Sequence, residues 1–321
     1  MTTPIPHWPG RMLTLAGGDQ VWLAGTTAPD PGSGDPPGRD LVLCVHGMSG
    51  AATNWTDLMA ELTPDFDCVA VDLPGSGRSP RPATRAGYSV TGHAATVARL
   101  IETLDSGPVH LIGNSMGGAV SVRVAARRPD LVKTLTLISP ALPDRKVRGS
   151  VAHFPVIALP FAGTWLIQRY AARYPVENRV AGVFAMCFCD PARLHPDRFA
   201  LEVEELRRRD ALGYEATTLA RSARTLVCET FQPGPFSLWR AARRVTAPSL
   251  VLFGSHDRLV DPRLAVRAAG TFRDARVEVL PETGHLAQME CPGLVAALFR
   301  EMVGETRARG AASSEASQVP G

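Results

Sequence analysis

The chain alternates short apolar runs with longer segments in which apolar residues recur at helical spacing. Short runs rich in Val, Ile and Leu, bounded by Gly, Pro or polar residues, are typical of buried strands. Because parallel strands need a crossover connection, the alternation predicts an α/β fold, a mostly parallel sheet with helices on both faces. Strands of this kind are predicted at residues 41–45, 68–72, 109–112, 134–139, 249–253 and 276–280.

The N-terminal part of the chain adds two strands to this sheet. Segments 11–15 and 20–24 flank a turn that contains Gly17 and Gly18, which predicts an antiparallel hairpin at one edge. The sheet would then have eight strands. Residues 29–39 repeat Pro and Gly, which suit neither a helix nor a ladder strand, so we expect a surface loop there.

The alternation breaks at residues 141–246, which contain helical patterns but no convincing strand. Helices are predicted there at residues 161–173, 177–188, 196–209 and 213–229. We therefore expect a core of residues 1–140 and 247–305, with a helical cap at residues 141–246 inserted after the sixth strand. Residues 306–321 are rich in Ala, Ser and Gly without large apolar anchors, which predicts a disordered tail.

Residues 151–167 form the most apolar part of the predicted cap. Prolines at positions 155 and 160 and the short length argue against a membrane span. We favour packing of this stretch against the core. An apolar wall for a lipophilic substrate and contact with a membrane surface are the alternatives.

Composition and charge narrow the class of protein. The 321 residues are 45% hydrophobic, which suits one globular domain with an insertion. The formal charge of +3, from 34 basic and 31 acidic residues, is too balanced to indicate a nucleic-acid partner. The first residues lack the basic start and apolar core of a secretion signal, so we expect a cytoplasmic location and no stable membrane insertion.

The six cysteines include no C-x-x-C pair, and free thiols are the favoured interpretation. Cys187 and Cys189 have no histidine at ligand spacing, which disfavours a metal site. Neither a metal nor an organic cofactor is predicted.

A candidate catalytic motif, Gly-Asn-Ser-Met-Gly, lies at residues 113–117 between a predicted strand and a helical stretch. In such a G-x-S-x-G elbow the glycines permit a tight turn that exposes the serine oxygen, so Ser115 is a candidate nucleophile. A serine needs a base and an acid that orients the base. His285 and Asp257 each follow a predicted strand and fill these roles.

Other acids remain possible at this stage. Asp261 lies four residues beyond Asp257, although its place before Pro262 suits a helix N-cap. A position after the sixth strand, near Ser139 or Asp144, is a further alternative.

The order Ser115, Asp257, His285 resembles that of the α/β-hydrolase fold family. Two further segments are similar to family motifs: His-Gly-Met at residues 46–48 and Asp-Leu-Pro-Gly-Ser-Gly-Arg-Ser at residues 72–79. Together the motifs cover roughly residues 40–140 and 245–303. The serine sets the chain apart from the epoxide hydrolases and haloalkane dehalogenases of this fold, which have an aspartate at that position.

The resemblance implies an acyl-type hydrolysis in which His285 deprotonates Ser115 and Asp257 holds the imidazole. The backbone amides of Met48 and Met116 would form the oxyanion hole. Supporting roles are expected for His46, which would brace the oxyanion loop, and for Gly47, Gly113 and Gly117.

Carboxylic esters are the default substrate of such a site. Residues 113–118 and 284–290 also resemble hydrolases that cleave carbon–carbon bonds in vinylogous diketones, but Leu286 and Met289 stand where that group often has tryptophan. Thioesterase and cofactor-free haloperoxidase activities would use the same triad, and a ligand-binding module is the non-enzyme alternative. The expected partner is a small, lipophilic molecule, with the protein a monomer or homodimer.

Overall fold

The computed structural model of the protein describes residues 5–26, 39–144 and 154–316. Most of the predicted surface loop at residues 29–39, the start of the apolar stretch 151–167 and residues 317–321 lie outside the described residues.

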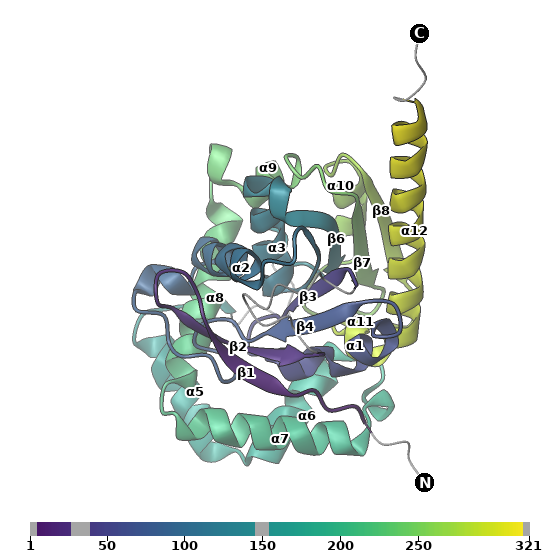
Figure 1. The fold of residues 1–321 in the computed structure, drawn as a ribbon. Helices are drawn as coiled ribbons and strands as arrows, with labels where there is room; N and C mark the ends of the chain where they lie inside the picture. Colours follow the sequence, from purple (N-terminus) through teal and green to yellow (C-terminus); the bar gives the residue numbers. More distant parts are fainter. Residues whose placement is uncertain (1–4, 27–38, 145–153, 317–321) are drawn as a thin grey trace.

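Eight strands form one sheet in the order β1-β2-β4-β3-β5-β6-β7-β8 (Figure 1). β1 pairs with β2 and β2 with β4 in antiparallel fashion, and every later pairing is parallel. The predicted mostly parallel sheet with a hairpin at one edge is therefore confirmed. The strands are β1 (Gly10–Thr14), β2 (Gln20–Gly25), β3 (Leu41–Val45), β4 (Asp67–Val71), β5 (Val109–Asn114), β6 (Val132–Ile138), β7 (Ser249–Gly254) and β8 (Ala275–Leu280).

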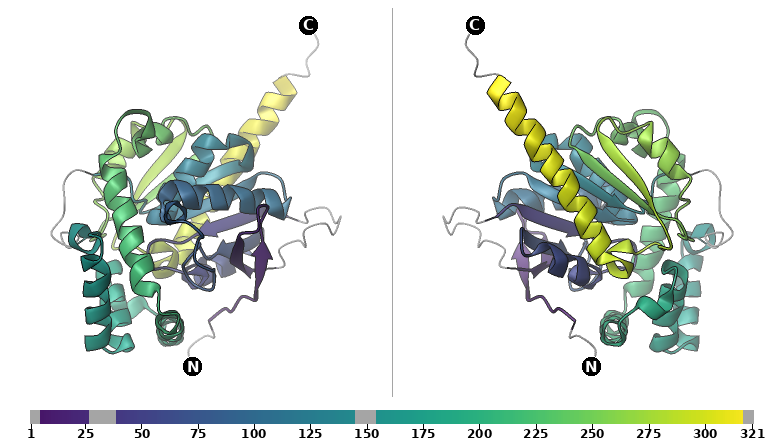
Figure 2. Two further views of the ribbon diagram at one scale, coloured as in Figure 1. Left: turned by 90° about the vertical axis from the view of Figure 1, so that its left-hand side faces the viewer. Right: turned by 90° about the vertical axis from the view of Figure 1, so that its right-hand side faces the viewer.

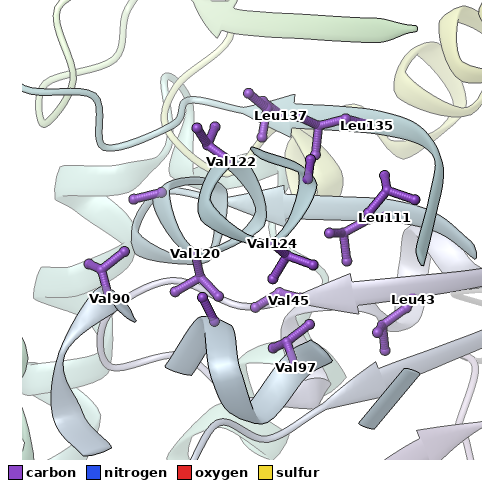
Figure 3. Packing of buried hydrophobic residues seen from close by; sticks show 14 of the residues in the cluster. Leu43, Val45, Val90, Val97, Leu111, Val120, Val122, Val124, Leu135 and Leu137 are labelled. Carbon is purple, nitrogen blue, oxygen red and sulfur yellow. The ribbon is translucent and has the colours of Figure 1, made fainter. Parts of the chain in front are cut away.

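The central strands are apolar on both faces because helices cover both faces. In β3, Leu43 lies between Val69 and Leu111 of the neighbouring strands. Its side chain belongs to a cluster with α2 and α3, seen from close by in Figure 3. The adjacent Val42 points to the other face and packs with Trp55 and with residues of α12.

The helices divide into a core set and a set between β6 and β7, which we call the insert. Figures 1 and 2 show α5, α6 and α7 of the insert gathered away from α12, which lies along the sheet. The core helices are α1 (Thr56–Leu62), α2 (Val90–Leu104), α3 (Met116–Arg127), α10 (Leu264–Ala269), α11 (Ala287–Glu290) and α12 (Pro292–Ala316). The insert contains α4 (Phe154–Ile157), α5 (Ala162–Arg173), α6 (Val176–Cys187), α7 (Pro196–Ala211), α8 (Glu215–Phe231) and α9 (Leu238–Ala242). Short 3₁₀ turns lie at Ala52–Trp55, Arg85–Tyr88, Pro129–Leu131, Pro191–Arg193 and Gly234–Phe236.

The two shortest helices of the insert are absent from the sequence-based expectation. A helix as short as α4 or α9 has too few turns to produce a clear periodic pattern. Although α9 falls within the predicted cap range of 141–246, its Leu238 and Trp239 are buried in the core cluster with α3.

The predicted disordered tail is wrong for residues 306–316. The structure continues α12 to Ala316. Earlier turns of this helix are anchored by the buried side chains of Phe299 and Met302, so the later turns extend an existing helix and need no new nucleus. Arg307 also pairs with Asp40, and the local sequence is rich in Ala and Arg, which favour helix.

Candidate functional site

Ser115 occupies a sharp turn between β5 and α3. Its backbone has φ 53° and ψ −118°, a conformation that non-glycine residues rarely adopt. Two hydrogen bonds hold the turn: the Ser115 amide donates to Ile138 O at 3.1 Å, and the Ala141 amide donates to Ser115 O at 2.9 Å. The backbone is therefore strained at the residue predicted to be the nucleophile.

The neighbouring glycines allow the elbow to pack tightly. A Cβ at Gly117 would lie 2.1 Å from Val45 O, at the end of β3. One at Gly113 would lie 2.5 Å from the hydroxyl of Ser121. Because such distances are shorter than real contacts, any side chain at either position would push α3 away from the sheet.

The loop after β3 lies directly against this elbow. A Cβ at Gly47 would be 3.0 Å from Ser115 Cβ. Gly47 O accepts a hydrogen bond from the Gly50 amide at 3.2 Å and lies 2.7 Å from His46 Nδ1. In a trans peptide the carbonyl and the following amide point in opposite directions, so the Met48 N–H points away from these partners.

His46 braces that loop from within the core. Its Nε2 accepts a hydrogen bond from the Leu73 amide at 2.9 Å, which leaves Nδ1–H as the donor to Gly47 O. Burial lowers the pKa of His46 to about 4, so the ring is neutral at pH 7. Each nitrogen of this neutral ring already has a hydrogen-bond partner, so the ring supports the loop and has no free nitrogen to act as a base.

The second candidate oxyanion donor, Met116, is the first residue of α3. The first amides of a helix have no partner within the helix, and the helix dipole favours negative charge beside them. A Cβ at Gly47 would lie 3.0 Å from Ser115 Cβ, so the residues that precede Met48 and Met116 are close in space.

His285 and Asp257 form a buried pair. His285 Nδ1 lies 2.8 Å from Asp257 Oδ2, while Oδ1 accepts the amides of Leu259 and Val260 at 2.8 and 2.9 Å. Burial alone would raise the pKa of Asp257, but the charge and hydrogen bond of His285, with the amide bonds, lower it below its ordinary value. The carboxylate is therefore ionised and oriented toward the imidazole.

The alternative acids have different surroundings. The carboxylate of Asp261 accepts the Arg263 amide at 2.9 Å and pairs with the guanidinium of the same residue. The predicted N-cap role is wrong, because the N-cap of α10 is Arg263 and Asp261 lies in the turn before it. Asp144 lines the cavity described below, whereas Ser139 is fully buried.

Two supporting residues had no role in the sequence-based prediction. Asn114 Nδ2 donates to Ile138 O and to His285 O, each at 3.0 Å. The residue before the candidate nucleophile therefore fixes the backbone of the loop that carries His285. Glu290 accepts the amides of Gly284 at 2.7 Å and Cys189 at 3.0 Å. In the sequence, Asn114 and Glu290 could have been noticed as polar residues within the Ser115 and His285 motifs. Their hydrogen-bond partners could not be predicted, because most of these partners are distant in the sequence.

Asp72 is a third such residue. Its buried carboxylate accepts the amides of Ala52 at 2.6 Å and Arg78 at 2.7 Å. A Cβ at Gly77, which has φ 52°, would lie 2.1 Å from that carboxylate. The motif at residues 72–79 therefore needs this glycine so that the loop can fold around the acid. Burial raises the pKa of Asp72 to about 6.

A cavity of about 410 Å³ lies between the core and the insert and contains both Ser115 and His285. Its wall is mainly apolar, which suits a lipophilic ligand. The apolar lining comprises Met48, Ala141, Leu142, Pro143, Phe154, Pro155, Val180, Val183, Phe184, Cys187, Leu206, Leu226, Val227, Phe231, Leu259, Val260, Leu264 and Leu286.

One corner of the cavity is polar and joins α7 to the loop after β3. Arg209 Nη1 donates to Ser49 O at 2.9 Å and lies 3.3 Å from Glu215. Nearby, Asn54 Nδ2 donates to Glu202, whose pKa is raised by burial. The insert thus contacts the loop that carries the Met48 amide.

Among the residues that the structure describes, no three His, Cys, Asp or Glu side chains converge as a metal site would require. Burial raises the pKa of the Cys187 thiol to about 12. Across the described ranges, none of the helices combines the length and apolar character that a membrane crossing requires.

Comparison with known sequences points to one family. The model of the alpha/beta hydrolase family matches residues 42–298. Monoacylglycerol lipase abhd6-B of Xenopus laevis is 27% identical over 277 residues, which is 84% of this chain and 77% of the relative. A 2-hydroxy-6-oxononadienedioate/2-hydroxy-6-oxononatrienedioate hydrolase of Cupriavidus pinatubonensis (strain JMP 134 / LMG 1197) is 27% identical over 260 residues, 79% of this chain and 83% of the relative.

Solved structures show the same fold. A membrane phospholipase A described as a bacterial virulence factor superposes with a TM-score of 0.72 at 21% identity, covering 94% of this chain and 87% of that one. An epoxide hydrolase of Vigna radiata gives a TM-score of 0.74 at 17% identity, with 93% and 98% covered. At these identities the likeness concerns the fold alone.

Proposed function

Because the chain belongs to the alpha/beta hydrolase family, we propose that it is a serine hydrolase that cleaves carboxylic esters of lipophilic substrates through an acyl-enzyme. The observation that carries this proposal is the buried His285–Asp257 pair, of which His285 lines the same apolar cavity as the strained Ser115. The hydrolase class follows from the family, whereas the residue roles and the ester substrate are our inference.

In the proposed mechanism, His285 takes the proton of Ser115 as its oxygen attacks the ester carbonyl. The Met48 and Met116 amides stabilise the oxyanion, and His285 then returns the proton to the departing alcohol. Asp257 stabilises the imidazolium and holds its tautomer. Water attacks the acyl-enzyme by the same steps, which releases the acid and regenerates Ser115.

We propose that the insert acts as a cap that selects the substrate. Apolar residues of α4, α6 and α8 form much of the cavity wall, so the acyl part of the ester would lie against them. A cavity of about 410 Å³ suits an acyl chain of moderate length better than a bulky polymer. Similarity to a monoacylglycerol lipase supports a lipid-like ester.

Carbon–carbon bond hydrolysis is the second candidate, supported by similarity to the Cupriavidus pinatubonensis enzyme. The charges of the cavity favour the ester. Arg209 is the only lysine or arginine among the described lining residues, and it lies 3.3 Å from Glu215 and 3.6 Å from Glu205. Because its charge is already compensated, a dianionic diketone would gain little from it.

The test is hydrolysis of p-nitrophenyl esters from acetate to palmitate by the wild type and by Ser115→Ala. We expect turnover with an optimum at intermediate chain length, and a loss of at least about 10³-fold in kcat for the variant. The unfolding temperature of Ser115→Ala should not fall, because alanine fills no new space and leaves the backbone bonds of the turn in place.

Two results would contradict the proposal in different ways. Turnover by Ser115→Ala near that of the wild type would remove Ser115 from its role. Labelling of Ser115 by a fluorophosphonate without ester turnover would favour a narrow substrate such as a diketone or thioester. Absence of both would favour a ligand-binding module.

A further inference from the structure

Large apolar side chains are exposed where α4 joins α5. Phe161 is 89% exposed and Trp165 57%, while Leu159 and Val156 are 51% and 46% exposed. We call these four residues the α4–α5 patch. The sequence favoured packing of this stretch against the core, but only parts of it, such as Ala158 and Gly163, are buried. Several large apolar residues exposed within one short connection are a feature of binding surfaces.

The backbone of this connection presents Phe161 to solvent at an energetic cost. Phe161 has φ 61° and ψ −54°, close to the centre of a classic γ-turn and strained for any residue with a Cβ. The turn is also tight, because a Cβ at Gly163 would lie 1.9 Å from Ile157 O. Exposure of the Phe161 side chain to water is energetically unfavourable, so a contact with another molecule would explain why the strained backbone presents it at the surface.

The patch is continuous with the mouth of the cavity. Pro155 and Phe231 line the cavity and are also exposed, so they mark its rim. Pro155 precedes Val156 of the patch within α4. Arg224 of α8 donates to Ala158 O at 2.7 Å, which fixes α4 beside the helix that ends at Phe231. A surface that covered the patch would therefore lie at the cavity entrance.

The charge of this region selects the type of surface. Residues 154–174 contain Arg169 and Arg173 but no aspartate or glutamate. Arg169 lies 5.7 Å from the centre of the Trp165 ring, and Arg173 lies 6.0 Å from that of Tyr174. Arginine next to aromatic rings suits the headgroup region of an anionic bilayer. Two copies of the chain joined through this region would instead bring like charges together.

We propose that the α4–α5 patch docks the enzyme onto an anionic lipid surface, so that the cavity mouth faces the lipid. Phe161 and Trp165 would enter the boundary between headgroups and acyl chains, and Arg169 and Arg173 would contact phosphates. Delivery of substrate by this route rests on the proposed esterase function. Docking itself depends only on the patch and on Arg169 and Arg173.

The test is co-sedimentation with vesicles of phosphatidylcholine, with and without phosphatidylglycerol, in a Ser115→Ala background that prevents hydrolysis. Replacing Phe161 by Asn and Trp165 by Ser together should lower the partition coefficient at least about tenfold. Because the backbone of position 161 is already occupied by a residue with a Cβ, Asn adds no backbone strain there, and this variant should fold. Arg169→Gln with Arg173→Gln should weaken binding only to the anionic vesicles.

The matched control is Val266→Ser, which removes an 81% exposed apolar side chain from α10 and should change binding less than about twofold. Absence of binding by the parent protein, or equal binding by the Phe161/Trp165 variant, would overturn the proposal. Loss of a lipid-free dimer in sedimentation velocity on the same substitutions would reassign the patch to an interface between two copies.

The docking and esterase proposals can fail separately. If wild-type protein binds vesicles but does not hydrolyse soluble esters, the esterase is wrong and the docking stands. If the Phe161/Trp165 variant hydrolyses p-nitrophenyl butyrate as the wild type does and also still binds vesicles, only docking is wrong.

Discussion

Single residues decide which acid serves the candidate base. Asp257 and Asp261 are four positions apart, and both are buried carboxylates. Asp257 reaches His285 Nδ1 at 2.8 Å, whereas Asp261 is engaged by the backbone and side chain of Arg263. Since an imidazole needs an acceptor at Nδ1 to present Nε2 in the basic form, only the first contact suits catalysis.

We expect Asp257→Asn to lower kcat by about 10⁴-fold, because the amide favours the wrong imidazole tautomer. Asp261→Asn is the matched control and should change kcat less than about tenfold. The measurement is steady-state kinetics on a reactive p-nitrophenyl ester, with the unfolding temperature of each variant as a check. The reverse ranking would move the acid to Asp261.

Among the elements, α7 links the insert to the oxyanion loop. Arg209 donates to Ser49 O, and Ser49 stands at φ 60° in the turn that begins at Gly47. The same guanidinium lies near Glu205 and Glu215, which fix its position. The planar guanidinium of Arg209 has several N–H donors, so it can contact Ser49 O and the carboxylates of Glu205 and Glu215 at the same time. A lysine ammonium cannot reproduce that geometry. Arg209 is therefore placed to act as a positioning residue for the Met48 amide.

Arg209→Lys should lower kcat about tenfold while KM changes less than about threefold, because the oxyanion loop loses its brace and the cavity wall keeps its charge. Arg208→Lys, on the neighbouring position, should lower kcat much less, since Arg208 donates to Glu205 and acts on the loop only through that shared carboxylate. Parallel losses in both variants, or a change in KM alone, would contradict this role.

At the scale of the whole molecule, buried histidines couple stability to pH. Burial lowers the pKa of His46 and His110 to about 4 and that of His93 to about 3. The unfolded chain, with ordinary histidine pKa values near 6.5, therefore binds more protons than the native state as the pH falls from about 7 toward 4. The histidines by themselves therefore lower the stability as the pH falls over that range.

Buried acids act in the opposite direction. Burial raises the pKa of Asp72 to about 6 and also raises those of the buried glutamates of α7 and α8, so these groups take up protons more readily in the native state. Protonation of Asp72 begins at lower pH than the loss caused by the histidines, which starts near pH 6.5. As the pH falls below 7, the destabilisation caused by the histidines should therefore exceed the stabilisation caused by the acids.

We expect the urea midpoint of unfolding to fall between pH 7 and pH 6, with a loss on the order of 1 kcal/mol in the free energy of unfolding. Urea titrations at the two pH values, followed by circular dichroism, measure this. A midpoint that stays constant or rises on acidification would contradict the expectation that the histidines outweigh the buried acids in this range.

Much of the fold was predictable because it depends on local patterns. The apolar runs and their spacing specify the strands, and a serine between glycines after a strand specifies the elbow at Ser115. The limit of local reasoning is visible in α12, where residues 306–316 lack apolar anchors of their own but extend a helix anchored by Phe299. Segment composition cannot reveal a helix that is nucleated elsewhere.

The sequence by itself determined the class of fold, the candidate residues Ser115, Asp257 and His285, and their placement after strands. Only the tertiary structure showed that the carboxylate of Asp257 contacts the imidazole of His285 while that of Asp261 pairs with Arg263. It also brought Asn114 to the histidine loop and left Phe161 exposed beside the cavity mouth. Such contacts join residues far apart in the chain, and their partners are set by how the elements pack and not by any pattern within one segment.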